Sequence, residues 1–149
     1  MGLDMYLTAK CYTGYGDEHD SLKQAIKDTN PIGLGDFELK YLEFQIGYWR
    51  KANQIHNWFV ENVQKGVDDC GDYVVELKQL HALKDLCEEV LKDESLVAEK
   101  LPPRKGFFFG SYEIDEYYFN DLHHTLDILD KIFSNQHHKL WDFYYHSSW

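Results

Sequence analysis

The sequence predicts a single α+β domain, in which a small, mostly antiparallel sheet of three to four strands packs against three amphipathic helices. Segments of alternating apolar and polar residues occur near both ends of the chain, and segments with a period of 3.6 residues lie between them. Strands and helices do not alternate regularly, as they would in a parallel α/β fold. The 149 residues contain no internal repeat or low-complexity linker and therefore fit one domain spanning 1–149.

Two strands are predicted in the first third of the chain. Residues 3–9, LDMYLTA, alternate apolar and polar side chains, which is typical of a half-buried strand. Residues 37–44, FELKYLEF, alternate in the same way. The segment between them, 12–36, contains several glycines and Asn30-Pro31, which predict a long loop with a short helix at 21–27.

The three helices are predicted over residues 46–64, 77–92 and 114–134. In the first, Trp49, Ala52, His56, Phe59, Val60 and Val63 form one apolar stripe on a helical wheel. In the second, Cys87 lies within the stripe, which predicts a buried and unreactive thiol. The third helix carries a long apolar stripe along its whole length and is strongly amphipathic.

Three shorter segments complete the predicted fold. Residues 73–75, Tyr-Val-Val, are strand-like, and residues 139–146 near the C-terminus predict the last strand. The run GFFFGS at 106–111 has too few glycines for a phosphate-binding loop and is interpreted as a buried strand or turn.

The composition narrows the range of partners. A formal net charge of −11 disfavours direct binding to nucleic acid or to an anionic membrane, because both require a basic surface. Most of the surplus carboxylates are expected to keep the protein soluble. A cationic partner, a small ligand, or mimicry of nucleic acid towards a basic protein remain as functional alternatives. Aromatic residues make up 16% of the chain and can fill a core or line a binding surface.

The cysteines indicate a reducing compartment. The chain contains an odd number of cysteines, Cys11, Cys70 and Cys87, and no C-x-x-C motif, so we expect all three to be unpaired. The start of the chain lacks the apolar region of a signal peptide, and no apolar run approaches 18 residues. The sequence thus predicts a cytoplasmic protein without a membrane segment.

Several motifs together carry a family resemblance. They are MGLDMYL at the start, YWRKANQIHNWFV at 48–60, DDCGDYVV at 68–75, GFFFGS at 106–111 and DEYYFNDL at 115–122. In this combination the chain resembles a functionally uncharacterised family of small bacteriophage and prophage proteins. The resemblance implies an accessory protein that acts in the host cytoplasm, and it implies no reaction and no catalytic residues. The loop 12–36 and the tail after Asn135 carry none of these motifs.

Two polar residues fall at positions where the helical wheels favour apolar ones. His56 lies in the stripe of the first helix, and Asp121 lies within the apolar arc of the third. Because a buried charge needs a partner, we expect the two side chains to be buried and hydrogen bonded to each other. A buried His–Asp pair is the arrangement of a general base with an orienting carboxylate, but it is also that of an ordinary satisfied core pair. The structural interpretation is favoured because no nucleophile motif accompanies the pair.

A second candidate site lies on the outer face of the first predicted helix. Arg50, Asn53 and Asn57 share that face, and Lys51 and Trp58 lie together on its flank. An exposed Trp beside two cations can stack on a base or hold an acidic group. The alternative, which we favour, is a solvated face whose Trp packs under a loop.

No metal or cofactor site is predicted. His123-His124, His137-His138 and Asp68-Asp69-Cys70 contain suitable side chains, but adjacent residues on a helix point about 100° apart and cannot share one ion. Neither H-E-x-x-H nor a pair of C-x-x-C motifs occurs.

Three functional hypotheses remain. The leading one is a non-enzymatic binding protein made by a phage, which blocks or sequesters a host protein or small molecule. The second is a small hydrolase of nucleotide-like substrates that uses His56 with Asp121. The third is a pure protein-interaction module. A concave pocket reached by His56 or Arg50 would favour a ligand site, and a flat apolar patch would favour a protein partner.

Overall fold

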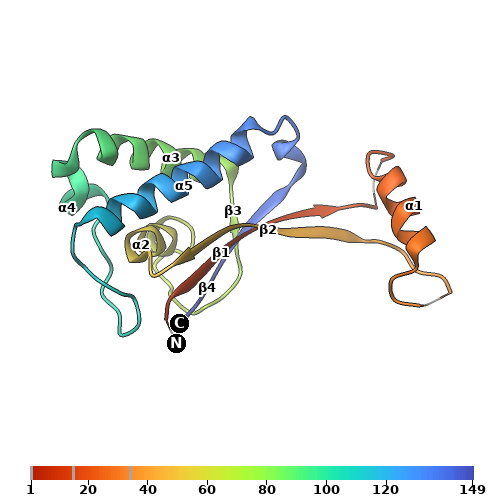
Figure 1. The fold of residues 1–149 in the computed structure, drawn as a ribbon, viewed down its shortest axis with the longest axis horizontal. Helices are drawn as coiled ribbons and strands as arrows, with labels where there is room; N and C mark the ends of the chain where they lie inside the picture. The colour runs from red at the N-terminus through yellow and green to blue at the C-terminus, as the bar shows by residue number, and fades with distance from the viewer. Residues whose placement is uncertain (1, 15, 34) are drawn as a thin grey trace.

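The computed structural model describes residues 2–14, 16–33 and 35–149. Met1 of the first motif and residues 15 and 34 of the predicted loop lie outside the described residues. In chain order, the elements are β1 (Asp4–Tyr12), α1 (Asp20–Thr29), β2 (Tyr41–Arg50), α2 (Asn53–Asn62), β3 (Tyr73–Val75), α3 (Leu77–Lys92), α4 (Val97–Lys100), α5 (Glu116–Ser134) and β4 (Asp142–Ser148), with short 3-10 turns at Glu94–Leu96 and His138–Leu140 (Figure 1).

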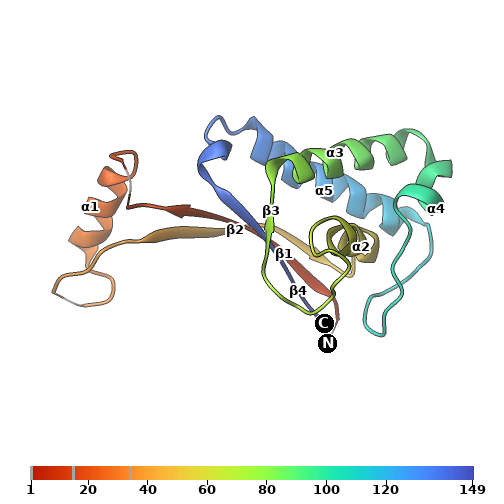
Figure 2. The same cartoon turned by 180° about the vertical axis from the view of Figure 1, so that it is seen from behind.

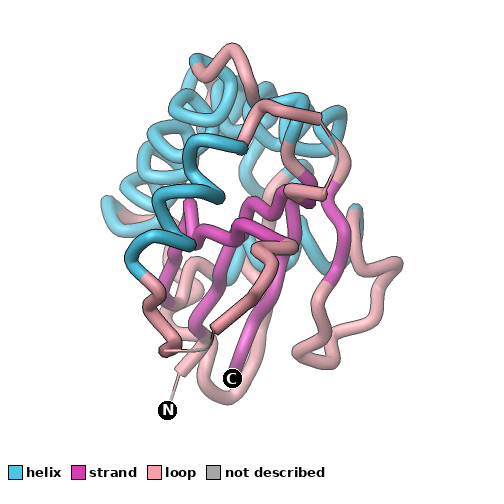
Figure 3. Tube along the Cα trace, turned by 90° about the vertical axis from the view of Figure 1, so that its right-hand side faces the viewer, coloured by secondary structure: helices cyan, strands magenta, loops and turns pink. Residues whose placement is uncertain are grey.

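The four strands form one antiparallel sheet in the order β2-β1-β4-β3, which confirms the predicted α+β class. Paired residues share a face, so Met5, Trp49 and Ser147 point to the core while Asp4, Arg50 and Ser148 point away from it. The helices of the body gather on one side of the strands (Figure 3). The other face of the sheet is open to solvent and carries half-buried side chains.

Trp49 joins the sheet to two helices on the core face. Its ring centroid lies 6.0 Å from that of Phe59 in α2, and its Nε1 donates a hydrogen bond to Oγ1 of Thr125 in α5 at 2.9 Å. The α3 helix then packs along α5. Trp49 thus holds α2 against the sheet. The candidate site is built between α2 and the segments that follow it in the chain.

The predicted helix 77–92 is confirmed residue for residue as α3. It begins at Leu77 because Oε1 of Gln79 accepts a hydrogen bond from the backbone N–H of Glu76, which satisfies one free donor of the first turn. Cys87 is fully buried, as predicted, and burial raises the pKa of its thiol to about 12. The predicted helix 114–134 begins two residues later, at Glu116, because the carboxylate of Asp115 accepts from the backbone N–H groups of Tyr117 and Tyr118.

The predicted helix 46–64 is wrong in its first part. Residues up to Arg50 belong to β2, and only Asn53–Asn62 form a helix. Trp49 is buried because it alternates with exposed Tyr48 and Arg50 on a strand, and not because it shares a helical stripe with His56. The strand ends before Lys51, whose φ of 60° is a left-handed conformation that a lysine rarely adopts.

The predicted strand 37–44 is displaced towards the C-terminus, because β2 begins at Tyr41 and continues to Arg50, into the region predicted to be helical. A register shift opposite Leu7 and Thr8 adds one residue to β2, so the alternation of the sequence changes phase within the strand. Residues 37–40 precede the strand and carry no regular secondary structure.

The hairpin of β1 and β2 extends beyond the rest of the sheet as an arm. Pairing of β1 with β4 ends at Lys10 and Asp142, whereas pairing with β2 continues to Tyr12 and Tyr41. The α1 helix is longer than the short helix expected at 21–27. It lies across the tip of this arm, far from the helices of the body (Figures 1 and 2). The start of β1 and the end of β4 lie side by side at the opposite end of the sheet, where Asp4 pairs with Ser148 (Figure 1).

The three cysteines are free, as expected. In the described part of the chain, no helix has the length and apolar character needed to span a membrane.

Candidate functional site

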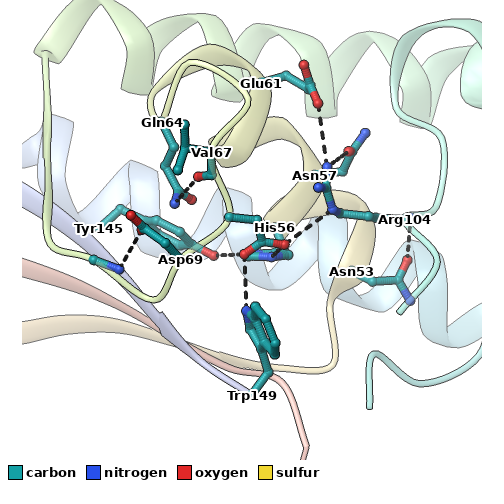
Figure 4. Close-up of polar contacts among 12 residues, drawn as sticks. Asn53, His56, Asn57, Glu61, Gln64, Val67, Asp69, Arg104, Tyr145 and Trp149 are labelled. Carbon is teal, nitrogen blue, oxygen red and sulfur yellow. Dashed lines mark hydrogen bonds and ion pairs between the residues drawn. The ribbon is translucent and has the colours of Figure 1, made fainter. Parts of the chain in front are cut away.

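His56 of α2 is the centre of a buried polar network (Figure 4). Its Nδ1 lies 2.7 Å from the hydroxyl of Tyr145 in β4, and its Nε2 lies 3.1 Å from Oδ2 of Asp68. Burial lowers the pKa of His56, and the neighbouring carboxylate of Asp68 opposes this effect only in part. The neutral ring then has one consistent arrangement, in which Nε2–H donates to Asp68 and Nδ1 accepts from the Tyr145 hydroxyl.

Asp68 connects this buried histidine to the surface. In addition to His56, its Oδ2 faces Nε of Arg104 at 3.4 Å, and its Oδ1 accepts a hydrogen bond from Nε1 of Trp149 at 3.1 Å. One carboxylate therefore joins the loop after α2, the segment before α5 and the end of the chain. The side chain of Asp68 is only 14% exposed, so a cationic neighbour is needed to compensate its charge.

Asn53, at the start of α2, fixes the neighbouring segment 104–111. Its Nδ2 donates to the carbonyl oxygens of Phe109 at 3.0 Å and Ser111 at 2.8 Å, and its Oδ1 accepts from the backbone N–H of Arg104 at 3.1 Å. The amide thus replaces the strand partners that this irregular segment lacks. Asn57, one helical turn later, accepts from a guanidinium N–H of Arg104 at 2.9 Å.

The expected pair of His56 and Asp121 does not form. His56 is buried, as predicted, but both of its ring nitrogens contact other residues. Asp121 is half-buried and accepts a hydrogen bond from Nε2 of Gln54 at 3.1 Å. Helical wheels show how deeply a side chain lies but not which residue it meets, and the true partner of His56 comes from a loop. That loop contains Asp68-Asp69-Cys70, whose side chains in the sequence indicate only a candidate for metal.

The five residues of the second candidate face are also rearranged. Arg50 lies at the end of β2 and Lys51 at the junction with α2, so neither belongs to the helix. Asn53 is buried, and Asn57 accepts a hydrogen bond from the guanidinium of Arg104. Trp58 is only 7% exposed and packs edge-on against Phe59, so it presents no stacking surface. The predicted outer face is therefore wrong as a surface, although three of its members meet again in a cleft.

That cleft, which we call the polar cleft, has a volume of about 300 Å³ and opens at the start of α2. Arg50 and Lys51 line one side together with Asn53, and Glu113 and Asp121 line it from the segment before α5 and from α5 itself. Burial raises the pKa of Asp121, and the hydrogen bond from Gln54 opposes this rise. Side chains of both charge signs therefore line a single cleft.

The backbone at Lys51 is strained where it borders the polar cleft. Its positive φ is unusual for a non-glycine residue, and such conformations persist only where the surroundings enforce them. A Cβ atom added to Gly110 would lie 3.0 Å from Cβ of Lys51, so the glycine permits this close approach of segment 104–111. Functional sites are common locations for such strain.

A second cleft, the aromatic cleft, lies on the other side of segment 104–111 and has a volume of about 280 Å³. Arg104, Lys105, Phe107 and Trp149 line it, with Asp68. Phe107 is 94% exposed. His56 lines neither cleft, which leaves it no route to a bound molecule except through Asp68.

Within residues 2–14, 16–33 and 35–149, no group of three or more His, Cys, Asp or Glu side chains is placed to hold a metal ion. Comparisons with protein-family models, with curated proteins and with solved structures find no match to this chain.

Proposed function

We propose that the protein is a binding protein, and that the polar cleft holds a small zwitterionic molecule of amino-acid size. The observation that carries this proposal is the presence of cations and carboxylates in one cleft. Arg50 and Lys51 suit a carboxylate or another anionic group, and Asp121 and Glu113 suit an ammonium group. The volume of about 300 Å³ is at the lower end of the range for ligand pockets, which favours a small ligand.

The surrounding framework supports binding rather than general base catalysis. A general base must reach the proton that it removes. His56 is fully buried with both ring nitrogens engaged, so its role in this proposal is to position Asp68 and, through Asp68, Arg104 at the start of segment 104–111, whose Gly110 and Ser111 line the polar cleft. The Asn53 amide, itself buried, fixes the same segment.

The family resemblance extends the proposal to a biological role. In a phage accessory protein, such a cleft serves to sequester a small host molecule in the cytoplasm. Sequestration requires affinity and no turnover, which agrees with a preformed cleft whose walls are held by buried hydrogen bonds.

Isothermal titration calorimetry with the free amino acids tests the proposal. Each amino acid is compared with the carboxylic acid and the amine that carry only one of its two charged groups. We expect binding of the zwitterion and weak or absent binding of either single-charge analogue. Lys51→Gln and Asp121→Asn should each reduce affinity about ten- to hundredfold, as expected for loss of one charge-assisted hydrogen bond.

Lys105→Gln is the matched control, because it removes a cation from the aromatic cleft and leaves the polar cleft intact. Its affinity should equal that of the wild type. Absence of binding for every amino acid, or equal binding of the single-charge analogues, would contradict the proposal.

A further inference from the structure

The α1 helix at the tip of the arm is amphipathic and leaves most of its apolar side uncovered. Leu22, Ala25 and Ile26 have the i, i+3, i+4 spacing of one helix face, and Leu22 is 40% exposed. None of the ten residues of the helix is buried. A helix of this length is only marginally stable alone in water, so its apolar side needs a surface to cover it.

An apolar groove of about 330 Å³ lies at the base of the same arm, on the core face of the sheet. Phe44 and Ile46 of β2 form one side, Ile128 and Ile132 of α5 form another, and Trp141 closes the end. Phe44 is 52% exposed although it lies against Trp141, with ring centroids 5.7 Å apart. The groove is thus a continuation of the core that remains open where the arm leaves the body.

The two surfaces also complement each other in charge. Lys131 and His138 line the groove. Asp17, Glu18 and Asp20 precede or begin α1, so the start of the helix is acidic. A helix with an acidic start and an apolar groove with a basic rim attract each other and fix the direction of docking.

The arm prevents α1 from reaching the groove of its own chain. Strand pairing continues to Tyr12 and Tyr41, and the backbone N–H of Thr13 donates to the carbonyl of Lys40 at 2.9 Å. This holds α1 at the far end of the arm, away from the end of α5 (Figure 1). A fold-back would require breaking these hydrogen bonds, whereas a second copy can bring its own helix to the groove without any such cost.

We therefore propose that two copies of the chain exchange arms, with α1 of each copy docked in the apolar groove of the other. The arrangement has two-fold symmetry, so each helix–groove contact is made twice. It is independent of the polar cleft, which lies at the other end of α5.

Sedimentation velocity over a wide range of concentrations tests the exchange. The wild type should sediment as a dimer. A helix variant, Leu22→Asp with Ile26→Asp, and a groove variant, Phe44→Asp, should each sediment as monomers with unchanged circular dichroism, because the altered side chains are not buried. Phe107→Asp changes an exposed aromatic residue at the other end of the body and should remain dimeric.

Mixing the two monomeric variants is the decisive step. A hybrid pair restores one of the two contacts, because the helix variant offers an intact groove and the groove variant offers an intact helix. The mixture should therefore contain a dimer that neither variant forms alone. A monomeric wild type, including one with a small apolar molecule bound in the groove, overturns the proposal. Variants that stay dimeric, or a mixture that never forms a dimer, overturn it as well.

Discussion

The hydroxyl of Tyr145 lies 2.7 Å from Nδ1 of His56, and both side chains are completely buried. The phenol ring of Tyr145 also stacks on Phe59, with centroids 3.9 Å apart and planes 7° from parallel. This contact anchors α2 to the centre of the sheet and sets the position from which His56 holds Asp68. The position of His56 and Asp68 therefore depends on the hydrogen bond between Tyr145 and His56, and neither of these two residues lines the polar or the aromatic cleft.

Tyr145→Phe should lower the free energy of unfolding by about 1–3 kcal/mol, because it leaves the buried Nδ1 of His56 without a donor while keeping the stacked ring. Chemical denaturation measures the loss. Tyr144→Phe is the control, since Tyr144 lies on the outer face of the same strand and its change should be close to zero. Equal effects of the two substitutions would show that the hydrogen bond contributes nothing.

The stability of the protein should fall as the pH drops below 6.5, in part because of His56. Burial holds the folded-state pKa of His56 below its ordinary value of 6.5, so the unfolded chain binds a proton that the folded chain does not. Stability from this source is present above pH 6.5 and is lost as the pH falls. His56→Gln should therefore flatten the decrease in unfolding free energy between neutral and acidic pH.

The matched control for this pH effect is His81→Gln, which changes an exposed histidine stacked on Phe133. It should leave the pH dependence as in the wild type. If His56→Gln and the wild type lose stability in parallel on acidification, His56 does not carry the effect.

Asp121→Asn should stabilise the protein at neutral pH. Burial raises the folded-state pKa of Asp121 above its ordinary value of 3.8, so ionisation opposes folding as the pH rises. An asparagine removes this cost and can still accept the hydrogen bond from Gln54. The melting temperature should rise by about 2–4 °C for each kcal/mol gained, and the gain should shrink towards acidic pH. A lower melting temperature would indicate that Asp121 is needed for the fold.

The parts of the fold that follow local rules were predictable. The α3 helix has an apolar stripe, a first-turn glutamine that caps it and a clear end, and its predicted bounds match the structure. The burial of Cys87 was predictable for the same reason, because a stripe shows which side chains of a helix are buried. The burial of His56 was also predicted, but α2 is buried on almost every side, including at Asn53 and Gln54, so a stripe does not account for it.

The boundary between β2 and α2 could not be predicted because apolar residues continue across it. Ile46 and Trp49 fit a helical period with the residues of α2, and the break depends on a left-handed Lys51, for which lysine gives no signal. The partner of His56 was missed because it is set by the path of a loop, and Tyr145 meets His56 only through the pairing of β4 with β1. Such contacts depend on tertiary structure.

The most direct test of a ligand site in the polar cleft is to follow the backbone amide signals by two-dimensional NMR during titration with the amino acid that binds best. The largest shifts should occur at Lys51, Asn53 and Gln54 and at Gly110 and Ser111, which line the cleft. In Asp121→Asn they should require about ten- to hundredfold more amino acid, and in Lys105→Gln they should occur as in the wild type. Shifts centred on Lys105, Phe107 and Trp149, or no shifts at all, would contradict the assignment of the polar cleft as the binding site.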